Sequence, residues 1–255
     1  MIDLHSHILP GLDDGARTVE ESLDMAQQAI DQGITHLMCT PHHLNGKFMN
    51  PADSVIEAVD KLQKELDQRH LPLTLLEGQE VRLTEVLLSE IGKESVLFID
   101  VTDRYLLLEL PTKELPLHIE GIFYQLIKRG HIPVIAHPER NLVFRKDPNR
   151  LLPFLKMGAL TQLTAPSIVG AFGKEIQYAS KQLLEHQMGF MVASDAHNVS
   201  SRAFLLKEAY DEIQKICGSE TVVAMQKMAK DLVNGDPVDR PNYRAIKESS
   251  SVLYS

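Results

Sequence analysis

The sequence contains only two cysteines, and their surroundings exclude one kind of phosphatase chemistry. The two show no C-x-x-C spacing, so they fit reduced, packed thiols better than a disulfide or a redox pair. A cysteine-dependent phosphatase needs a C-x5-R sequence, which brings a thiolate under a phosphate cradle. Six residues beyond Cys39 stands Asn45, and six beyond Cys217 stands Val223. Phosphoester hydrolysis through a cysteine nucleophile is therefore excluded.

Long apolar runs, a signal peptide and a surplus of positive charge are also missing. No uncharged apolar stretch is long enough for a transmembrane helix, and the N-terminus lacks the basic residues and apolar core of a signal peptide. The net charge of -9 at pH 7 argues against a nonspecific nucleic-acid surface. The sequence thus predicts a cytoplasmic protein that neither inserts into membranes nor binds nucleic acid, and it leaves the oligomeric state open.

Apolar residues alternate between strand-like and helix-like spacing along most of the chain. A strand is predicted from Ile2, and further strands at about 34–40, 73–77, 105–110, 132–136, 159–164 and 190–194. Thr18 and Glu21 form a capping box at the start of the first helix, and Asn50-Pro51 is expected to cap the second. The helices are predicted at about 18–33, 50–66, 84–93, 119–130, 149–156, 176–184, 201–217 and 220–233.

Seven strands that alternate with helices predict a parallel sheet that closes or nearly closes. Short right-handed β-α-β crossovers leave few other topologies, and 255 residues is a common length for a one-domain α/β barrel. We expect a distorted (β/α)7 TIM-like barrel over residues 1–234, followed by a polar tail over 235–255. The serine cluster at 249–251 in this tail is expected to fray. Barrels of this type carry their sites at the carboxyl ends of the strands.

The first strand carries two histidines, His5 and His7, whose spacing directs both imidazoles to the same side. Just beyond them, a Pro-Gly turn is followed by the carboxylates of Asp13 and Asp14. This mixed set of nitrogen and oxygen donors is one that Zn, Mn or Fe accepts. The spacing also arises by chance, so the rest of the chain decides whether a metal binds here.

Potential metal ligands recur at the ends of the other predicted strands, and only the sixth strand, which ends in Thr164, contributes none. Five histidines and four carboxylates would meet at one barrel mouth, which exceeds the needs of a single four-coordinate ion and implies two or three ions. Neighbouring ions activate water near neutral pH, so the pattern indicates metal-assisted hydrolysis. The nine candidates are His5, His7, Asp14, His42, Glu80, Glu109, His137, Asp195 and His197.

This pattern resembles the polymerase and histidinol phosphatase (PHP) superfamily of metal-dependent phosphoesterases over nearly the whole chain. Within that superfamily, residues 5–15 and 39–43 are similar to the bacterial tyrosine-protein phosphatases associated with capsule and exopolysaccharide synthesis in Gram-positive bacteria. The motifs that carry the resemblance are His5-Ser-His7, Thr40-Pro-His42, Gly78-Gln-Glu80, Ala136-His-Pro-Glu-Arg140 and Ser194-Asp-Ala-His197.

The resemblance implies a protein-tyrosine phosphatase that acts on a bacterial tyrosine kinase and its targets. It also implies arginines near the phosphate, and Arg140 and Arg202 follow ligand-bearing strand ends, although either could be a solvated surface charge. Many superfamily members carry histidines where this chain has Asp14 and Glu109, so its two or three divalent ions are expected to be Mn, with Fe or Zn as alternatives. The implied ligand sets are His5, His7, Glu80 and Asp195 for the first ion, Glu80, Glu109 and His137 for the second, and Asp14, His42 and His197 for the third, with Glu80 bridging.

Three other functions remain open. Another PHP phosphomonoesterase, such as one acting on histidinol phosphate, is separated from the tyrosine phosphatases only by family likeness. An amidohydrolase often bridges its metals with a modified lysine at the end of strand four, where this chain has Glu109. A non-catalytic barrel that binds a partner would be favoured if ligands were missing, and none is missing.

The role of Asp13 bears on the choice of substrate. Its carboxylate could orient a metal ligand, protonate a leaving oxygen or stabilise the turn before Gly15. His43 is expected to point away from its neighbour His42 and is a candidate for supporting the metal ligands. With the ligands assigned as above, no unambiguous general acid remains at the mouth. A phenolic ester, whose leaving group has a pKa of about 10, then needs the least help, which favours phosphotyrosine over phosphoserine.

Overall fold

The computed structural model describes residues 1–93 and 95–246, and the paired strands in this part of the chain are parallel. The strands are β1 (Ile2–Ser6), β2 (His36–Cys39), β3 (His42–His43), β4 (Thr74–Glu77), β5 (Glu80–Arg82), β6 (Tyr105–Glu109), β7 (Ile132–Ala136), β8 (Leu160–Thr164) and β9 (Met191–Ala193). The helices are α1 (Val19–Asp31), α2 (Ala52–Gln68), α3 (Leu87–Glu90), α4 (Ile119–Lys128), α5 (Leu142–Lys146), α6 (Leu152–Met157), α7 (Ala165–Val169), α8 (Lys174–Glu185), α9 (Leu206–Cys217) and α10 (Ser219–Val233). Short 3-10 helices are η1 (Ile91–Lys93), η2 (Pro138–Arg140) and η3 (Pro148–Leu151).

The strands form two parallel sheets, and their pairing over the described residues does not close into one barrel. One sheet has the order β1-β2-β4 and the other the order β3-β5-β6-β7-β8-β9. The second predicted strand is divided into β2 and β3 at Thr40-Pro41, and the third is followed by β5 after Gly78-Gln79. Proline has no N–H to donate to a strand ladder, which explains the first break. A parallel bridge between Ser6 and Ala196 links β1 to the chain just after β9.

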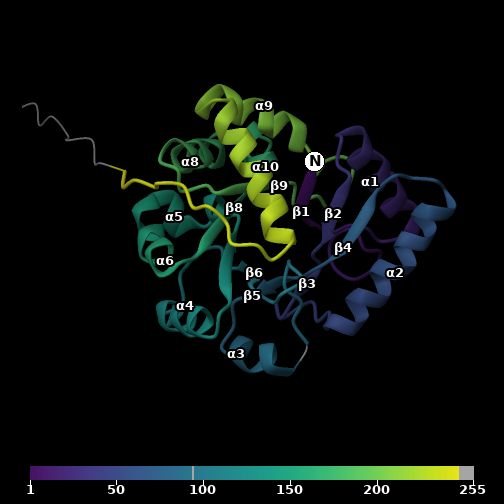
Figure 1. Ribbon diagram of the computed structural model, residues 1–255, viewed down its shortest axis with the longest axis horizontal. Helices are drawn as coiled ribbons and strands as arrows, with labels where there is room; N and C mark the ends of the chain where they lie inside the picture. Colours follow the sequence, from purple (N-terminus) through teal and green to yellow (C-terminus); the bar gives the residue numbers. More distant parts are fainter. Residues whose placement is uncertain (94, 247–255) are drawn as a thin grey trace, which may run out of the picture.

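The helices lie around the outside of the strands, so that the strands form the buried centre of the molecule (Figure 1). Residues 106–108 of β6 and 134–135 of β7 are completely buried. Such continuous apolar runs are typical of parallel strands that are covered on both faces. No helix within the described residues has both the length and the apolar composition needed to cross a lipid bilayer.

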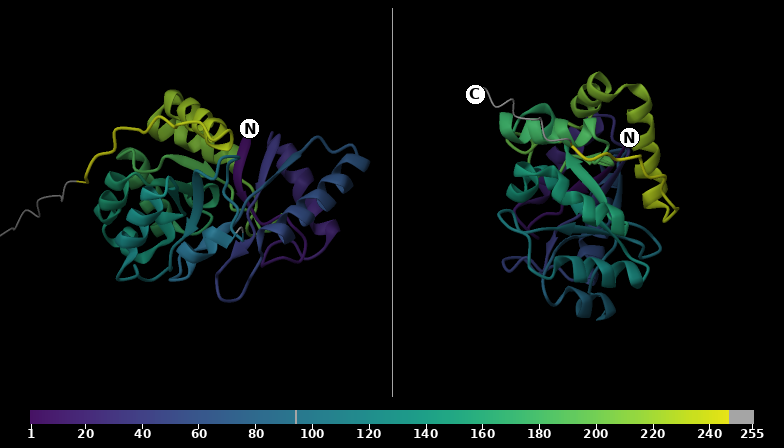
Figure 2. Two further views of the ribbon diagram at one scale, coloured as in Figure 1. Left: turned by 60° about the horizontal axis from the view of Figure 1, so that its bottom comes forward. Right: turned by 90° about the vertical axis from the view of Figure 1, so that its left-hand side faces the viewer.

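The last part of the described chain covers the amino ends of the strands. Helix α10 packs against β1 and β9, and Figure 2 shows it beside α9 on one side of the molecule. The Tyr105 hydroxyl, at the start of β6, donates to the Asp236 carbonyl at 2.7 Å. Arg240 donates to the Leu155 carbonyl at 3.1 Å, close to the start of β8. The predicted tail is thus packed as far as Ile246, whereas the serine cluster at 249–251 lies outside the described residues.

Helix α1 begins where the sequence predicts. The Thr18 side chain accepts a hydrogen bond from the backbone N–H of Glu21 at 3.3 Å, which is the first half of the expected capping box. The second half differs, because the Glu21 carboxylate accepts from the backbone N–H of Arg17 at 2.8 Å instead of from Thr18.

The expected cap of α2 is wrong in its detail. Pro51 occupies the cap position, and the Asn50 side chain donates instead to the backbone carbonyls of Leu12 and His42 at 3.0 and 2.8 Å. Asn50 therefore ties together two loops that carry candidate ligands, a long-range role that a local capping pattern does not reveal.

Two predicted helices are shorter in the structure. The helix expected at 84–93 is reduced to α3 and the 3-10 helix η1. The helix expected from 201 begins at Leu206, because the Asn198 side chain accepts hydrogen bonds from the backbone N–H groups of Ser200 and Arg202 and forms a turn there. The short helices α5 and α7 were not predicted.

Candidate metal centre

The structure brings the nine predicted ligands together at the carboxyl ends of the strands. Each lies in, at the end of, or shortly after a strand, except Asp14, which lies in the loop after β1. Among the residues that the structure describes, three groups have ligand atoms within 4.8 Å of one another. We call them the first group (His5, His7, Glu80 and Asp195), the second group (His42, Glu80 and Glu109) and the third group (His7, Asp14, His42 and His197).

The first group has the dimensions of a tetrahedral metal site. The Nε2 atoms of His5 and His7 are 3.2 Å apart, and each lies 3.5 Å from Oε2 of Glu80. They lie 3.3 and 3.2 Å from Oδ1 of Asp195. A regular tetrahedron with edges near 3.3 Å places its corners about 2.0 Å from the centre, which matches the bond lengths of Zn and similar ions. The four donors therefore fit one divalent ion.

Glu80 is shared between the groups. Its Oε2 lies 2.8 Å from Nδ1 of His42, in the second group, and its Oε1 lies 2.7 Å from Nε2 of His137. Oε2 of Glu109 lies 3.9 Å from the same His42 nitrogen. The resemblance implied His137 as the third ligand beside Glu80 and Glu109, whereas the second group contains His42 in that place. His137 remains bound to the shared carboxylate.

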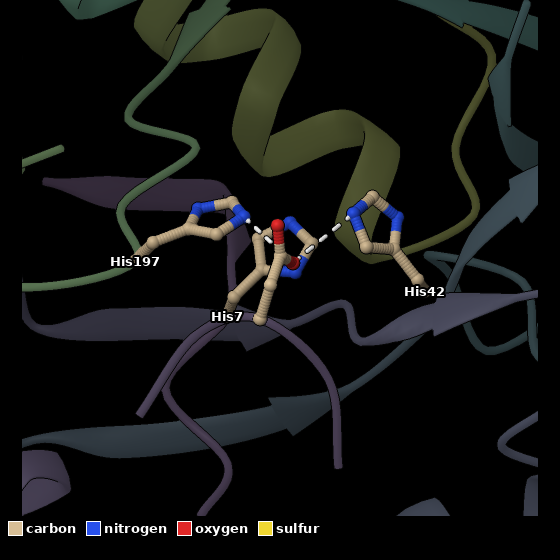
Figure 3. A group of neighbouring side chains, drawn as sticks. His7, His42 and His197 are labelled. Atoms are coloured by element: carbon tan, nitrogen blue, oxygen red, sulfur yellow. Dashed lines mark ion pairs between the residues drawn. The ribbon is translucent and has the colours of Figure 1, made fainter. Parts of the chain in front are cut away.

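The third group gathers three imidazoles around Asp14. Figure 3 shows His7, His42 and His197 close together, each reaching the group from a different part of the chain. Oδ1 of Asp14 lies 3.4 Å from Nε2 of His42 and 3.3 Å from Nε2 of His197. The His7 ring lies against the His197 ring, with centroids 3.8 Å apart.

Several buried polar atoms of these groups form no hydrogen bond of good geometry among the described residues, even where two of them lie close together, as His42 Nδ1 and Glu80 Oε2 do at 2.8 Å. Buried polar groups are normally paired, because desolvation without a partner is costly. Divalent cations at the three groups would supply the missing partners, so the donor set fits metal ions. The unpaired atoms are His42 Nδ1, Glu80 Oε2, Glu109 Oε2, Asp195 Oδ1 and His197 Nε2.

Asp13 supports the ligand His7. Its Oδ2 lies 2.6 Å from Nδ1 of His7, and its carboxylate also accepts from the backbone N–H groups of Gly15 and His42. Burial alone would raise the pKa of the Asp13 carboxyl, but His7 and the two N–H groups lower it to about 2. Asp13 is thus ionised at neutral pH and directs Nε2 of His7 toward the first group.

Two further supporting residues were not predicted. Oε1 of Gln162 lies 2.8 Å from Nδ1 of His5, and Arg82 lies 2.9 Å from Oε1 of Glu109. Gln162 lies at the middle of β8, and Arg82 is the last residue of β5. Arg82 also follows Glu80 by two residues, on the same side of β5.

Both candidate arginines meet at one carboxylate oxygen. Arg140 lies 2.7 Å and Arg202 lies 3.1 Å from Oδ2 of Asp195, whose Oδ1 faces the histidines of the first group. Arg202 also lies 3.6 Å from Asp14. The two guanidinium groups therefore border the candidate ligands, and neither is a solvated surface charge.

Burial lowers the pKa of His42, His137 and His197 alike, but the charges around these three histidines give different results. It lowers the pKa of His137 and of His197 to about 4, which keeps these imidazoles in the neutral form that binds metals. For His42, burial is outweighed by the carboxylates of Glu80 and Asp14, which raise its pKa to about 9. A metal ion at His42 must therefore displace a proton.

A cavity of about 300 Å³ opens beside these groups. Its ionisable lining residues are Asp14, His42, Glu80, Glu109, His137, Arg140 and Arg202. The remaining lining residues are Leu110, Thr112, Ile135, Ala136, Pro138, Asn141 and Phe144. His43 does not line it, because the His43 side chain is buried in β3 and accepts from the backbone N–H of Asn50 at 3.2 Å.

The chain has relatives along nearly its full length. The pattern of the family described as capsular polysaccharide synthesis, CpsB/CapC, matches residues 1–232. The chain is 40% identical over 247 residues to the tyrosine-protein phosphatase YwqE of Bacillus subtilis (strain 168), which covers 97% of both proteins. It is 29% identical over 225 residues to the tyrosine-protein phosphatase CpsB of Streptococcus agalactiae, which covers 86% of this chain and 92% of the relative.

A solved structure is equally similar. It belongs to a crystallographic study of YwqE from Bacillus subtilis and CpsB from Streptococcus pneumoniae, described as unique metal-dependent tyrosine phosphatases. It matches this chain with a TM-score of 0.92 and 40% identity and covers 97% of this chain and 100% of that chain.

Proposed function

The chain belongs to the CpsB/CapC family of capsular polysaccharide synthesis, and from this premise we propose that it is a metal-dependent protein-tyrosine phosphatase. It is then a phosphoric monoester hydrolase, as its resemblance to the PHP superfamily implies. The observation that carries the proposal is that five of the candidate ligands and both arginines line the same cavity. A barrel that only bound a partner would have no need of buried donors left without hydrogen bonds.

The three groups would hold two or three divalent ions. The donors are imidazoles and carboxylates without thiolates, and we propose Mn as the natural metal, with Fe or Zn as alternatives. Ions bound there would activate water at neutral pH and offset the negative charge of the phosphoryl oxygens.

The residues of the chain bind and orient the substrate. Arg140 and Arg202 each offer a fork of N–H donors that suits two phosphoryl oxygens, and both already contact a carboxylate oxygen at the edge of the cavity. Leu110, Pro138 and Phe144 would pack against the aromatic ring of phosphotyrosine. The three carboxylates that line the cavity, Asp14, Glu80 and Glu109, are all candidate metal ligands, so none of them would be free to protonate the departing oxygen once metal is bound. An aryl ester is the substrate that needs no such proton.

We also propose that the two sheets, linked by the Ser6–Ala196 bridge, form a distorted (β/α)7 barrel over residues 1–234, in which the second and third strands are broken. The natural substrates would be a bacterial tyrosine kinase and its targets in the cytoplasm, where the enzyme would take part in capsule or exopolysaccharide regulation.

Phosphotyrosine peptides are expected to be hydrolysed at least about tenfold faster, in kcat/KM, than matched phosphoserine peptides, a difference of about 1.4 kcal/mol. The phenolic oxygen leaves without protonation, and the aliphatic oxygen does not. The assay compares the two peptides and histidinol phosphate with one metal-analysed preparation. Equal rates on the two peptides, or a preference for histidinol phosphate, would replace the tyrosine assignment with that of another PHP phosphomonoesterase.

Asp13→Asn is expected to weaken metal affinity by about 10-fold to 100-fold while leaving turnover at saturating metal nearly unchanged. An amide holds the His7 ring less well than the carboxylate 2.6 Å away. Turnover is measured across a metal titration, with Asp24→Asn on the exposed face of α1 as the control. A deficit that persists at saturating metal and is largest for phosphoserine would instead make Asp13 the proton donor.

A further inference from the structure

Glu139 is a completely buried carboxylate that belongs to none of the three ligand groups. It lies in η2, between the candidate ligand His137 and the candidate phosphate-binding residue Arg140. A buried carboxylate is costly unless hydrogen bonds compensate its desolvation, so its position calls for a specific role.

The partner of Glu139 lies on β8, the strand whose end supplies no metal ligand. Oε1 of Glu139 accepts two hydrogen bonds from Thr164, one from the backbone N–H and one from the hydroxyl, both at 2.9 Å. The Thr164 hydroxyl also lies 2.7 Å from the Ser167 hydroxyl, which can donate to it. The Thr164 N–H and hydroxyl thus fix the Glu139 side chain against the carboxyl end of β8, and Ser167 in turn holds the Thr164 hydroxyl.

This attachment stabilises a backbone that is unfavourable by itself. His137 has φ 36° and ψ 54°, a left-handed conformation that costs a residue with a side chain on the order of 1–3 kcal/mol. The following η2 has only three residues, and such short 3-10 turns depend on their surroundings. The His137 N–H donates to the Gln162 carbonyl at 2.8 Å, so β8 holds the turn at two points.

Arg140 extends from the far end of this turn. Its guanidinium lies 2.7 Å from Oδ2 of Asp195 and 5.7 Å from the centre of the Phe172 ring, in the segment after α7. A shift of the turn relative to β8 would therefore move the guanidinium out of the cavity.

We propose that Glu139 is a positioning residue, which through its two hydrogen bonds to Thr164 fixes the turn 138–140 and so holds Arg140 at the phosphoryl-binding side of the cavity. This inference rests on the proposed function for the role of Arg140. According to this proposal, β8 orients Arg140 through Glu139, and Gln162 of β8 supports the candidate ligands His5 and His137. This explains why β8 has polar residues but supplies no ligand of its own.

The test compares Glu139→Ala with Glu139→Gln, because the amide oxygen of glutamine can accept the same two hydrogen bonds. Glu139→Ala is expected to raise KM for a phosphotyrosine peptide about tenfold, with kcat within about threefold of wild type, and Glu139→Gln to stay within about threefold in both. Metal content by elemental analysis is expected to be unchanged, and Glu120→Ala on the exposed face of α4 is the control. If Glu139→Ala does not fold, Thr164→Val removes one of the two hydrogen bonds, and an increase in its KM of about threefold is expected.

Two further measurements separate this inference from the proposed function. Calorimetric binding of inorganic phosphate needs no turnover, and Glu139→Ala is expected to weaken it about tenfold whichever ester is the natural substrate. In an Arg140→Ala background, the same substitution is expected to change phosphate affinity less than about twofold, because the residue that it positions is gone. The inference would be overturned if the two substitutions had their full, additive effects in the double variant. It would also be overturned if Glu139→Ala left phosphate affinity unchanged, or if Glu139→Gln were as impaired as Glu139→Ala.

Discussion

Glu80→Ala is expected to lower kcat/KM for a phosphotyrosine peptide by on the order of 10³-fold, which corresponds to about 4 kcal/mol of transition-state stabilisation. The Glu80 carboxylate is shared by the first and second groups, and it also lies 2.7 Å from His137. Its removal takes a donor from two metal sites at once and leaves buried imidazoles without their negative partner. Elemental analysis of the variant is expected to show at least one ion fewer per chain than in the wild type.

The comparison with an arginine variant makes this prediction specific. Arg202→Ala is expected to cost less, on the order of 10²-fold, because a guanidinium group binds the substrate but holds no metal. Glu77→Ala is the matched control, since Glu77 lies in β4, three residues before Glu80, and its side chain is exposed. Comparable turnover in the Glu80→Ala and Arg202→Ala proteins would show that Glu80 is not the shared ligand.

Removal of the metal ions is expected to abolish hydrolysis, with a decrease of more than about 10³-fold that Mn reverses. The surrounding fold holds the donors of the three groups in place; for example, Asp13 holds His7 and Gln162 holds His5. The site is therefore expected to keep its structure after chelation and to bind metal again. Partial turnover that remains after the last ion is removed would contradict this prediction.

Thermal unfolding gives a readout of the same prediction that does not depend on activity. Ions that bind only the folded state at 100 times their Kd add about 2.7 kcal/mol of stability each, and for a chain of this size about 5–10 °C in Tm per ion. The metal-free protein is therefore expected to unfold at a lower temperature, and added Mn is expected to restore the Tm. An unchanged Tm would show that the three groups hold no ion.

The sequence predicted the location of the site because the two signals that define it are local. Strands such as β7 have a clear apolar pattern and end directly at a candidate ligand, here His137. Parallel strands have their carboxyl ends on one side, so predicted strands and ligands were enough to bring the ligands together.

What the sequence did not predict depends on contacts between distant segments. The breaks at Thr40-Pro41 and Gly78-Gln79 divide the strands into two sheets, and the second of them depends on the Gln79 side chain, which accepts from the backbone N–H of Leu97 and donates to the Asn50 carbonyl. The pairing of Glu139 with Thr164 likewise joins residues that are 25 positions apart. A polar residue in an apolar segment signals that a partner exists, but not which residue it is.

The assignment of ligands to individual metal ions also could not be predicted from local sequence patterns. Family resemblance implied His137 beside Glu80 and Glu109, and in the structure both His42 and His137 lie against Glu80, at 2.8 and 2.7 Å. The left-handed backbone at His137 determines where its ring points, and the conformation of one residue with a side chain is not visible in a sequence pattern.

The most direct test of the account is to count bound ions as activity returns. Metal-free protein is titrated with Mn, and the ions per chain are determined by elemental analysis alongside the hydrolysis of a phosphotyrosine peptide in the same samples. Because the ligands form three groups that share Glu80 and two histidines, turnover is expected to rise as a second ion binds to each chain. Full turnover with no ion, or with one ion per chain, would contradict the account.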